Sequence, residues 1–168
     1  SGAIPHLLFS GAAGTGKTTL AKVLLNELDV DGGDIMIINA SNENNVDTMR
    51  TKINGFASSL PFGGDFKYVL LDEADYLSPS AQAILRNMME SFSMTCRFIL
   101  TCNYPNKVIP AIHSRCQGYH IEKLDEQEFA ARVATILISE GIDLDIDTLD
   151  VYADKAIAIL SAEKLKHQ

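Results

Sequence analysis

Short apolar runs alternate along this chain with segments in which apolar residues recur every three or four positions. The runs predict strands and the spaced pattern predicts amphipathic helices. Five strands are predicted, at residues 6–9, 35–39, 68–72, 98–102 and 119–121. Strands that alternate with helices favour right-handed crossovers. The expected fold class is therefore α/β, with a five-stranded parallel sheet flanked by helices on both faces.

Three helices are predicted between these strands, at residues 17–28, 46–60 and 79–92. The second is apolar at every third or fourth position as far as Leu60, and it carries Arg50 and Lys52 on its more polar side. Ser78 before Pro79 is a typical helix start. Two further helical patterns, at 125–140 and 148–165, follow the last predicted strand.

Composition narrows the possible partners. The formal net charge is −8 with a pI near 4.9, which argues against a broad basic face that would hold nucleic acid by itself. DNA contacts are expected to be local or shared with other subunits. Apolar runs are too short for a bilayer span and no leader is recognised, so no membrane partner and a cytoplasmic location, or a nuclear one in a eukaryote, are expected.

Residues 11–19 read GAAGTGKTT and lie between the first predicted strand and the first predicted helix. This context is typical of a phosphate-binding loop, in which glycines bring backbone N–H groups close to phosphate oxygens. Lys17 is expected to reach the β- and γ-phosphates of ATP, and the Thr18 hydroxyl is expected to ligate Mg²⁺. The alternative is a glycine-rich turn beside a lysine. The candidate nucleotide-binding residues are Gly11, Ala12, Ala13, Gly14, Thr15, Gly16, Lys17, Thr18 and Thr19.

Acids close the third predicted strand, in the stretch YVLLDEAD at residues 68–75. Asp72 and Glu73 should therefore lie at the carboxyl edge of the sheet, where the glycine-rich loop also lies. Asp72 is the candidate Mg²⁺ partner, and Glu73 is placed to orient or deprotonate a water that attacks the γ-phosphate. The alternative is a pair of solvated turn residues.

Two further polar residues are candidates for catalysis. Asn103 ends the fourth predicted strand and could bind the attacking water and the γ-phosphate, although asparagine after a strand is usually a turn former. Arg115 lies just before the fifth strand and outside any helical stripe. It is either a solvated loop arginine or a finger directed at a neighbour's nucleotide.

These motifs occur in longer stretches that carry a family resemblance. PHLLFSGAAGTGKTTLAKVL, NASNENNVDTMRTKI, FKYVLLDEADYLSPSAQAILRNMMESFSMTCRFILTCNY and IHSRC together resemble the AAA+ clamp-loader small subunits of the replication factor C type, including phage versions. The resemblance covers about residues 4–142. It implies that Asn103 is the first sensor and Arg115 a trans-acting arginine finger. The implied partners are sister subunits, a sliding clamp and primer-template DNA, with Arg50 and Lys52 in the region that tracks the template.

The resemblance also suggests a domain division, into an AAA+ core of the P-loop NTPase type at 1–124 and a partial helical lid at 125–168. Family members have an N-terminal segment that helps to hold adenine, a second sensor arginine in the lid, and a collar domain. None of these is recognised here, and Lys155 is the cation nearest to the sensor position. The expectation is a fragment of a longer protein or a divergent minimal copy, which leaves open whether this chain binds and hydrolyses ATP.

Three functions are compatible with the sequence. The first is an ATPase subunit of a sliding-clamp loader. The second is another AAA+ or DEAD-type nucleic-acid motor, suggested by the literal DEAD sequence at residues 72–75. The third is a scaffold that hydrolyses little ATP and donates Arg115 to a neighbour.

Overall fold

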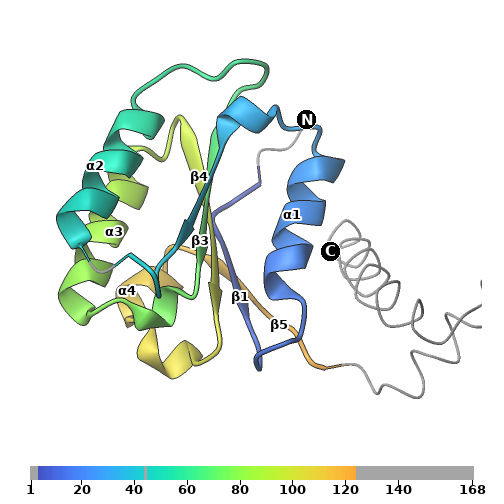
Figure 1. Cartoon of the computed structure of the whole chain (residues 1–168), viewed down its shortest axis with the longest axis vertical. Coiled ribbons are helices and arrows are strands. Elements are labelled where there is room, and N and C mark those ends of the chain that lie inside the picture. Colours follow the sequence, from blue (N-terminus) through green and yellow to red (C-terminus); the bar gives the residue numbers. More distant parts are fainter. Residues whose placement is uncertain (1–3, 44, 124–168) are drawn as a thin grey trace, which may run out of the picture.

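The computed structural model describes residues 4–43 and 45–123. Within these residues, five strands form one sheet in the order β2-β3-β4-β1-β5, and all four strand pairings are parallel (Figure 1). The strands are β1 (Leu7–Ser10), β2 (Ile35–Asn39), β3 (Lys67–Asp72), β4 (Cys96–Cys102) and β5 (Gln117–His120). The predicted α/β class is confirmed. The expected helices beyond residue 124, the 125–168 domain and Lys155 lie outside the described residues.

Helices cover both faces of the sheet. Figure 1 shows α1 (Lys17–Glu27) on one face and α2 (Val46–Ala57), α3 (Pro79–Ser91) and the short α4 (Pro110–His113) on the other. The caps of α2 and α3 are local, because Asn45 accepts from the amides of Asp47 and Thr48, and Ser78 accepts from Ala81. Three 3₁₀ turns complete the described elements: η1 (Gly32–Asp34), η2 (Ala74–Tyr76) and η3 (Pro105–Lys107).

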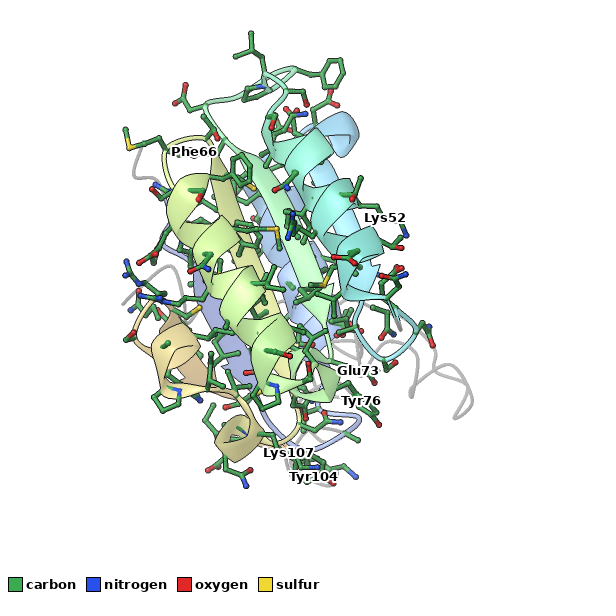
Figure 2. All side chains as sticks on the ribbon, turned by 90° about the vertical axis from the view of Figure 1, so that its left-hand side faces the viewer. Lys52, Phe66, Glu73, Tyr76, Tyr104 and Lys107 are labelled. Atoms are coloured by element: carbon green, nitrogen blue, oxygen red, sulfur yellow. The ribbon has the colours of Figure 1, made fainter. Side chains whose placement is uncertain are left out.

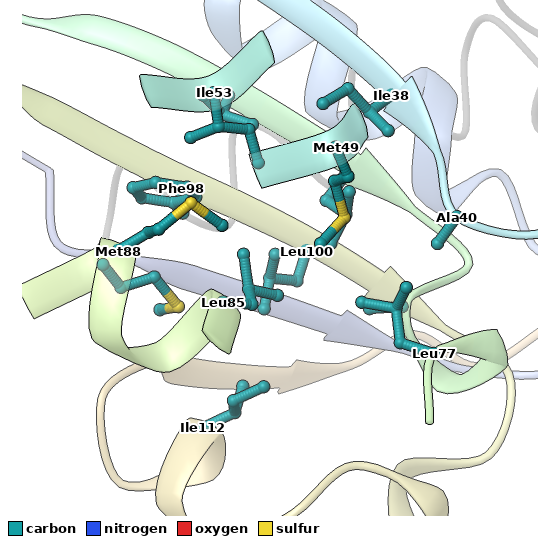
Figure 3. Packing of buried hydrophobic residues seen from close by; sticks show 14 of the residues in the cluster. Ile38, Ala40, Met49, Ile53, Leu77, Leu85, Met88, Phe98, Leu100 and Ile112 are labelled. Carbon is teal, nitrogen blue, oxygen red and sulfur yellow. The ribbon is translucent and has the colours of Figure 1, made fainter. Parts of the chain in front are cut away.

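Two apolar clusters hold the layers together. The larger packs α2 and α3 against β3 and β4 through residues such as Ile53, Leu85 and Phe98, all fully buried (Figure 3). The smaller joins α1 to the other face. β3 and β4 are buried along almost their whole length, which explains why they read as continuous apolar runs. The central part of the sheet is thus fixed from both sides.

The predicted second helix is too long. α2 ends at Ala57, and the Leu60 side chain is 85% exposed instead of facing the core. The hydroxyls of Ser58 and Ser59 donate to the carbonyl oxygens of Asn54 and Phe56, at 2.6 and 2.8 Å, and so satisfy acceptors at the helix end. The helix therefore ends before the apolar spacing does, and the two serine hydroxyls add to the backbone bonds at its end.

Strand boundaries also differ from the prediction. β3 and β4 begin earlier, at Lys67 and Cys96, and β5 covers residues 117–120 instead of 119–121. Lys67 is only 3% exposed, because its ammonium donates to the Phe56 carbonyl oxygen at 3.2 Å and lies 4.4 Å from the centre of the Phe56 ring. A polar residue therefore starts a buried strand. In the described part of the chain, no helix is long and apolar enough to cross a membrane.

Candidate nucleotide-binding site

The glycine-rich loop connects β1 to α1 and depends on glycine at three positions. Gly14 and Gly16 have φ values of 77° and 82°, in the left-handed region that L side chains rarely adopt. A Cβ atom on Gly11 would lie 2.4 Å from the carbonyl oxygen of Ile121, just beyond β5. Among the described residues, no side chain caps the N-terminus of α1. The positive end of the α1 dipole and its first amides are therefore presented to an anion.

Lys17 is buried within this loop, with 7% of its surface exposed. Its ammonium donates to the carbonyl oxygens of Gly11 and Ala12, at 2.9 and 2.8 Å, and lies 3.4 Å from Thr15 Oγ1. Burial lowers the pKa of Lys17 from its ordinary value of 10.5, while Cys102 and then Asp72 act in the opposite direction. The loop thus holds a cation beside the strand-end acids.

Asp72 meets the loop directly. The Thr18 hydroxyl donates to Asp72 Oδ1 at 2.7 Å, and the Thr101 hydroxyl on β4 donates to the same oxygen. Thr101 Oγ1 also accepts from the backbone amide of Glu73 at 3.0 Å. Glu73 has a left-handed backbone, with φ 57° and ψ 46°, which is uncommon for a residue other than glycine. The two acids expected to act at the nucleotide are therefore held by one threonine.

Asp75 fixes the end of β4. Its Oδ2 accepts from the amides of Asn103 and Tyr104, at 3.2 and 3.0 Å. The carboxylate is buried, and its Oδ1 has no hydrogen-bond partner within residues 4–43 and 45–123. These bonds set the backbone from which the Asn103 side chain extends.

The glycine-rich loop, the acids and the β4 terminus enclose a cavity of about 260 Å³. It is lined by Ala13, Gly14, Gly16, Lys17, Thr18, Thr19, Asp72, Glu73, Thr101 and Asn103. All but Thr101 were candidates from the sequence; Gly11, Ala12 and Thr15 belong to the same loop but do not line the cavity. Thr101 lies within the predicted strand at residues 98–102, to which the sequence assigns no chemical role. Its polarity within the apolar strand CRFILTC is the signal that could have identified it.

The oxygen donors here fit Mg²⁺. A hydroxyl and a carboxylate oxygen, from Thr18 and Asp72, lie 2.7 Å apart beside the cavity. Mg²⁺ is usually held in phosphate sites by one or two such oxygens together with substrate phosphates and water. No group of three or more His, Cys, Asp or Glu side chains suited to a metal occurs in the described part of the chain. The residues present therefore match a metal that arrives with a phosphate ligand.

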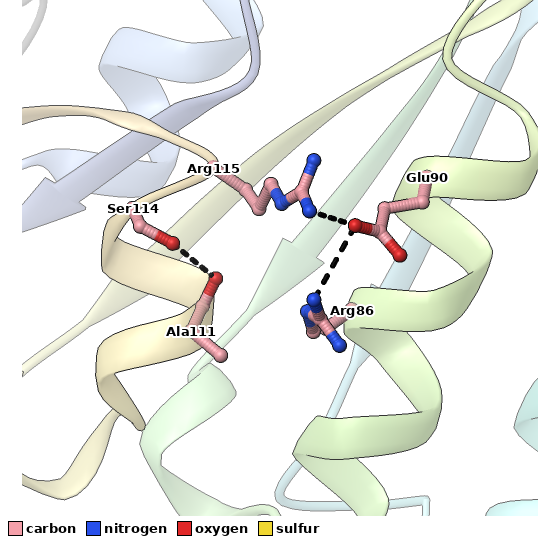
Figure 4. A network of polar contacts seen from close by, with 5 residues as sticks. All are labelled: Arg86, Glu90, Ala111, Ser114 and Arg115. Atoms are coloured by element: carbon pink, nitrogen blue, oxygen red, sulfur yellow. Dashed lines mark hydrogen bonds and ion pairs between the residues drawn. The ribbon is translucent and has the colours of Figure 1, made fainter.

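Arg115 lies away from this cavity. It follows α4, its side chain is 43% exposed, and its guanidinium forms an ion pair with Glu90 on α3 (Figure 4). Arg86 lies 3.4 Å from the same Glu90 oxygen. Arg115 is not among the residues that line this chain's cavity, so its predicted role as a trans-acting arginine finger stays a prediction.

Arg50 and Lys52 are exposed on α2, as predicted, and neither lines the cavity. Lys52, labelled in Figure 2, pairs with Glu43 at 3.0 Å. Their predicted contact with DNA stays a prediction.

The fold and the cavity together define a P-loop nucleotide-binding protein. The chain belongs to the AAA family, the ATPase family associated with various cellular activities, whose profile matches residues 7–123. It is 44% identical over 153 residues to the replication factor C small subunit of Methanoregula boonei, a match that covers 89% of this chain and 48% of the relative.

Two further relatives carry the same description. The replication factor C small subunit of Archaeoglobus fulgidus is 43% identical over 150 residues, covering 88% of this chain and 47% of that protein. The one from Picrophilus torridus is 41% identical over 172 residues, covering 96% and 54%. The chain therefore spans about half the length of the curated relatives that it matches.

Proposed function

We propose that this chain is the ATP-binding part of a clamp-loader subunit, which binds ATP with Mg²⁺ and couples ATP hydrolysis to the loading of a sliding clamp on primer-template DNA during replication. The observation that carries the nucleotide part is the 2.7 Å bond between Thr18 and Asp72 at a cavity lined by the glycine-rich loop. The similarity to replication factor C small subunits supports the clamp-loading part.

In this proposal the chain's own groups bind the triphosphate. The backbone amides of the loop and the first turn of α1 donate to phosphate oxygens, and the Lys17 ammonium exchanges its carbonyl acceptors for the β- and γ-phosphates. Thr18 and Asp72 are the residues that would hold the metal. When bound, Mg²⁺ neutralises the charge that develops on the phosphate oxygens.

Hydrolysis then requires an activated water. The Glu73 carboxylate accepts a proton from a water whose oxygen forms a bond to the γ-phosphorus, and the Asn103 amide orients that water. The bond from the γ-phosphorus to the β–γ bridging oxygen breaks, and its electron pair leaves with ADP. Inorganic phosphate is the second product, and the proton on Glu73 passes to solvent.

The remaining assigned residues act between molecules. Arg115 reaches a sister subunit's ATP, which agrees with its exposed position away from the chain's own cavity. Arg50 and Lys52 contact the DNA backbone from the exposed side of α2. A DNA contact limited to these two residues is local, which agrees with the net charge of −8.

The test measures ATP turnover by the chain assembled with its sister subunits, alone and with clamp, primer-template DNA, or both. Turnover is expected to rise most when both are present. Glu73→Gln should retain bound ATP without turnover, whereas Asp65→Asn, at an exposed position outside the cavity, should behave as the unchanged protein. Absence of stimulation by the two together would count against clamp loading.

Mixing variants then separates an active subunit from a scaffold. If Arg115→Ala lowers turnover at the neighbouring site while Lys17→Ala leaves total turnover unchanged, the chain serves only to donate the arginine. If each substitution lowers turnover, the chain both hydrolyses ATP and assists its neighbour.

A further inference from the structure

Thr101 is a polar residue inside the buried strand β4, where it is 1% exposed. Its neighbours in the strand pair with β3 in parallel register, with Leu100 opposite Leu71, so Thr101 lies beside the end of β3 at Asp72. Most of β4 packs apolar side chains on the two faces of the sheet: Cys96, Phe98, Leu100 and Cys102 on one and Ile99 on the other. A hydroxyl at this depth is costly unless it is bonded, and here it is bonded twice.

The hydroxyl is the donor in one of these bonds and the acceptor in the other. Its proton is donated to Asp72 Oδ1, and a lone pair accepts from the Glu73 amide at 3.0 Å. One atom, Thr101 Oγ1, therefore joins the carboxylate of the first acid to the backbone of the second. Neither bond could be made by an apolar side chain of the same shape.

The position of the Asp72 carboxylate depends on this bond. Thr18 and Thr101 approach Oδ1 from different elements, α1 and β4, so the carboxylate is held between them. Loss of the Thr101 bond leaves Thr18 as the one hydroxyl among the described residues that donates to this oxygen. The carboxylate could then rotate about its side-chain torsions, which separates the two oxygens proposed to hold the metal.

The direction of the Glu73 side chain depends on the second bond. Its backbone is left-handed at φ 57°, and such a conformation persists only where surrounding contacts enforce it. The bond from its amide to Thr101 is one of these contacts. Relaxation of this backbone would redirect the carboxylate away from the cavity that it lines.

We propose that Thr101 is a positioning residue that sets the metal-binding Asp72 and the water-activating Glu73 relative to each other through a single hydroxyl. The proposal rests on the proposed ATP hydrolysis, because it concerns the geometry of the groups that carry it. Thr101 acts through these two acids and takes no part in bond making or breaking.

The test compares Thr101→Val, which keeps the shape but loses the hydroxyl, with Thr101→Ser, which keeps the hydroxyl. Residues that orient metal ligands typically change metal affinity or activity by about 10–100-fold when they are lost. Turnover at saturating ATP should therefore fall by about this factor in Thr101→Val, and the Mg²⁺ concentration for half-maximal turnover should rise. Thr101→Ser should restore both quantities. The exposed Thr51→Val, on α2, is the matched control.

Further readouts separate positioning from simple structural support. ATP binding in excess EDTA should be the same in Thr101→Val as in the unchanged protein, since the loop and Lys17 are untouched. Thr101→Val with unchanged turnover and Mg²⁺ dependence but a lower Tm would overturn the proposal. So would a Thr101→Ser variant that is folded yet as impaired as Thr101→Val.

Failure of the proposed function is distinguishable from failure of this inference. If the unchanged assembly hydrolyses no ATP, the proposed function is wrong, and hydrogen exchange of the Glu73 amide, measured by NMR on the full chain without nucleotide, still tests Thr101. Faster exchange in Thr101→Val but not in Thr101→Ser supports the positioning contact. Equal exchange in all three proteins overturns it.

Discussion

The hydroxyl of Thr18 donates a hydrogen bond to Oδ1 of Asp72 at 2.7 Å, although the two residues lie 54 positions apart in the chain. Thr18 belongs to the first turn of α1, and Asp72 is the last residue of β3. The bond joins the phosphate-binding loop to the acidic strand end across the carboxyl edge of the sheet. Any metal held with a nucleotide at this edge would meet both oxygens at once.

The first prediction concerns Thr18→Val. This change removes the hydroxyl that serves as a metal ligand and as a partner of Asp72, so the Kd for ATP with Mg²⁺ should rise by about 10–100-fold. The Kd in EDTA should stay the same, because Lys17 and the loop amides do not depend on this hydroxyl. Isothermal calorimetry measures both values, and Thr48→Val on the exposed side of α2 is the control. An equal loss of ATP affinity with Mg²⁺ and in EDTA would contradict the assignment of Thr18 as a metal ligand.

The second prediction contrasts two glycines. Gly11→Ala would place Cβ 2.4 Å from the Ile121 carbonyl oxygen, a backbone atom that cannot rotate away, so the free energy of unfolding should fall by about 1–3 kcal/mol. Gly55 lies within α2, and a Cβ atom at this position would have no atom within 4 Å beyond its chain neighbours and the backbone of its own helix. Gly55→Ala should therefore raise the free energy of unfolding by about 0.5–1 kcal/mol. Urea denaturation measures both. A stable Gly11→Ala protein would show that the loop and the end of β5 can separate.

The third prediction concerns pH. His6 Nδ1 accepts from the Phe98 amide at 3.0 Å, and burial, followed by Arg97, lowers the pKa of His6 to about 4 from 6.5. Between these values the unfolded chain binds more protons than the folded one. The contribution of the partly buried, neutral His6 to the free energy of unfolding is thus complete above pH 6.5, and it is lost as the pH falls towards 4. Its size is on the order of 1–2 kcal/mol, after allowance for the partial exposure of the ring.

The measurement for His6 is the Tm at pH 7.5 and at pH 5. The unchanged protein should lose more stability between these values than His6→Gln, which cannot titrate there. An identical loss in the unchanged protein and His6→Gln would remove His6 as the cause.

The fourth prediction concerns Arg115 and Glu90. Their side chains are 43% and 34% exposed, and ion pairs at such positions contribute at most about 1 kcal/mol to stability. Arg115→Ala and Glu90→Gln should therefore leave the Tm nearly unchanged. If Arg115 completes a neighbour's site, Arg115→Ala should nevertheless lower turnover of the assembly by about 10³-fold or more. A large fall in Tm would mean that Arg115 is required for the fold, and turnover would then say nothing about its role.

Much of the fold could be predicted because its signals are local. β2 occupies the predicted residues 35–39, and the cap of α3 at Ser78 is formed by neighbours in sequence. Met88 and Met89, which lie within the predicted helix at residues 79–92, are buried in the core. The glycine-rich loop and the acids at the end of β3 are identified from their residue pattern and from their places beside predicted strands, and their chemical roles stay predictions.

Contacts between distant segments could not be predicted. Asp34, just before the predicted strand at residues 35–39, is 1% exposed and accepts from the amides of Phe62 and Gly63, which lie 28 and 29 positions away. Lys67 begins a buried strand because an aromatic ring and a carbonyl oxygen elsewhere receive its ammonium. Thr101 is bonded to Asp72, the last residue of a different strand, and to Glu73, the residue after it. Each of these contacts depends on which segments the fold places side by side. The periodicity of apolar residues does not specify this arrangement.

The strand order has a consequence for how the protein is made. β1 pairs with β4 and β5, with Leu7 opposite Ile99 and Gln117, so the first of the five described strands finds its hydrogen-bonding neighbours in the last two of them. Contacts at such sequence separation form slowly, because long segments must be ordered before they are made. On the ribosome, the glycine-rich loop therefore emerges long before its acidic and threonine partners, and a nascent chain that stops before β4 cannot assemble a complete binding site.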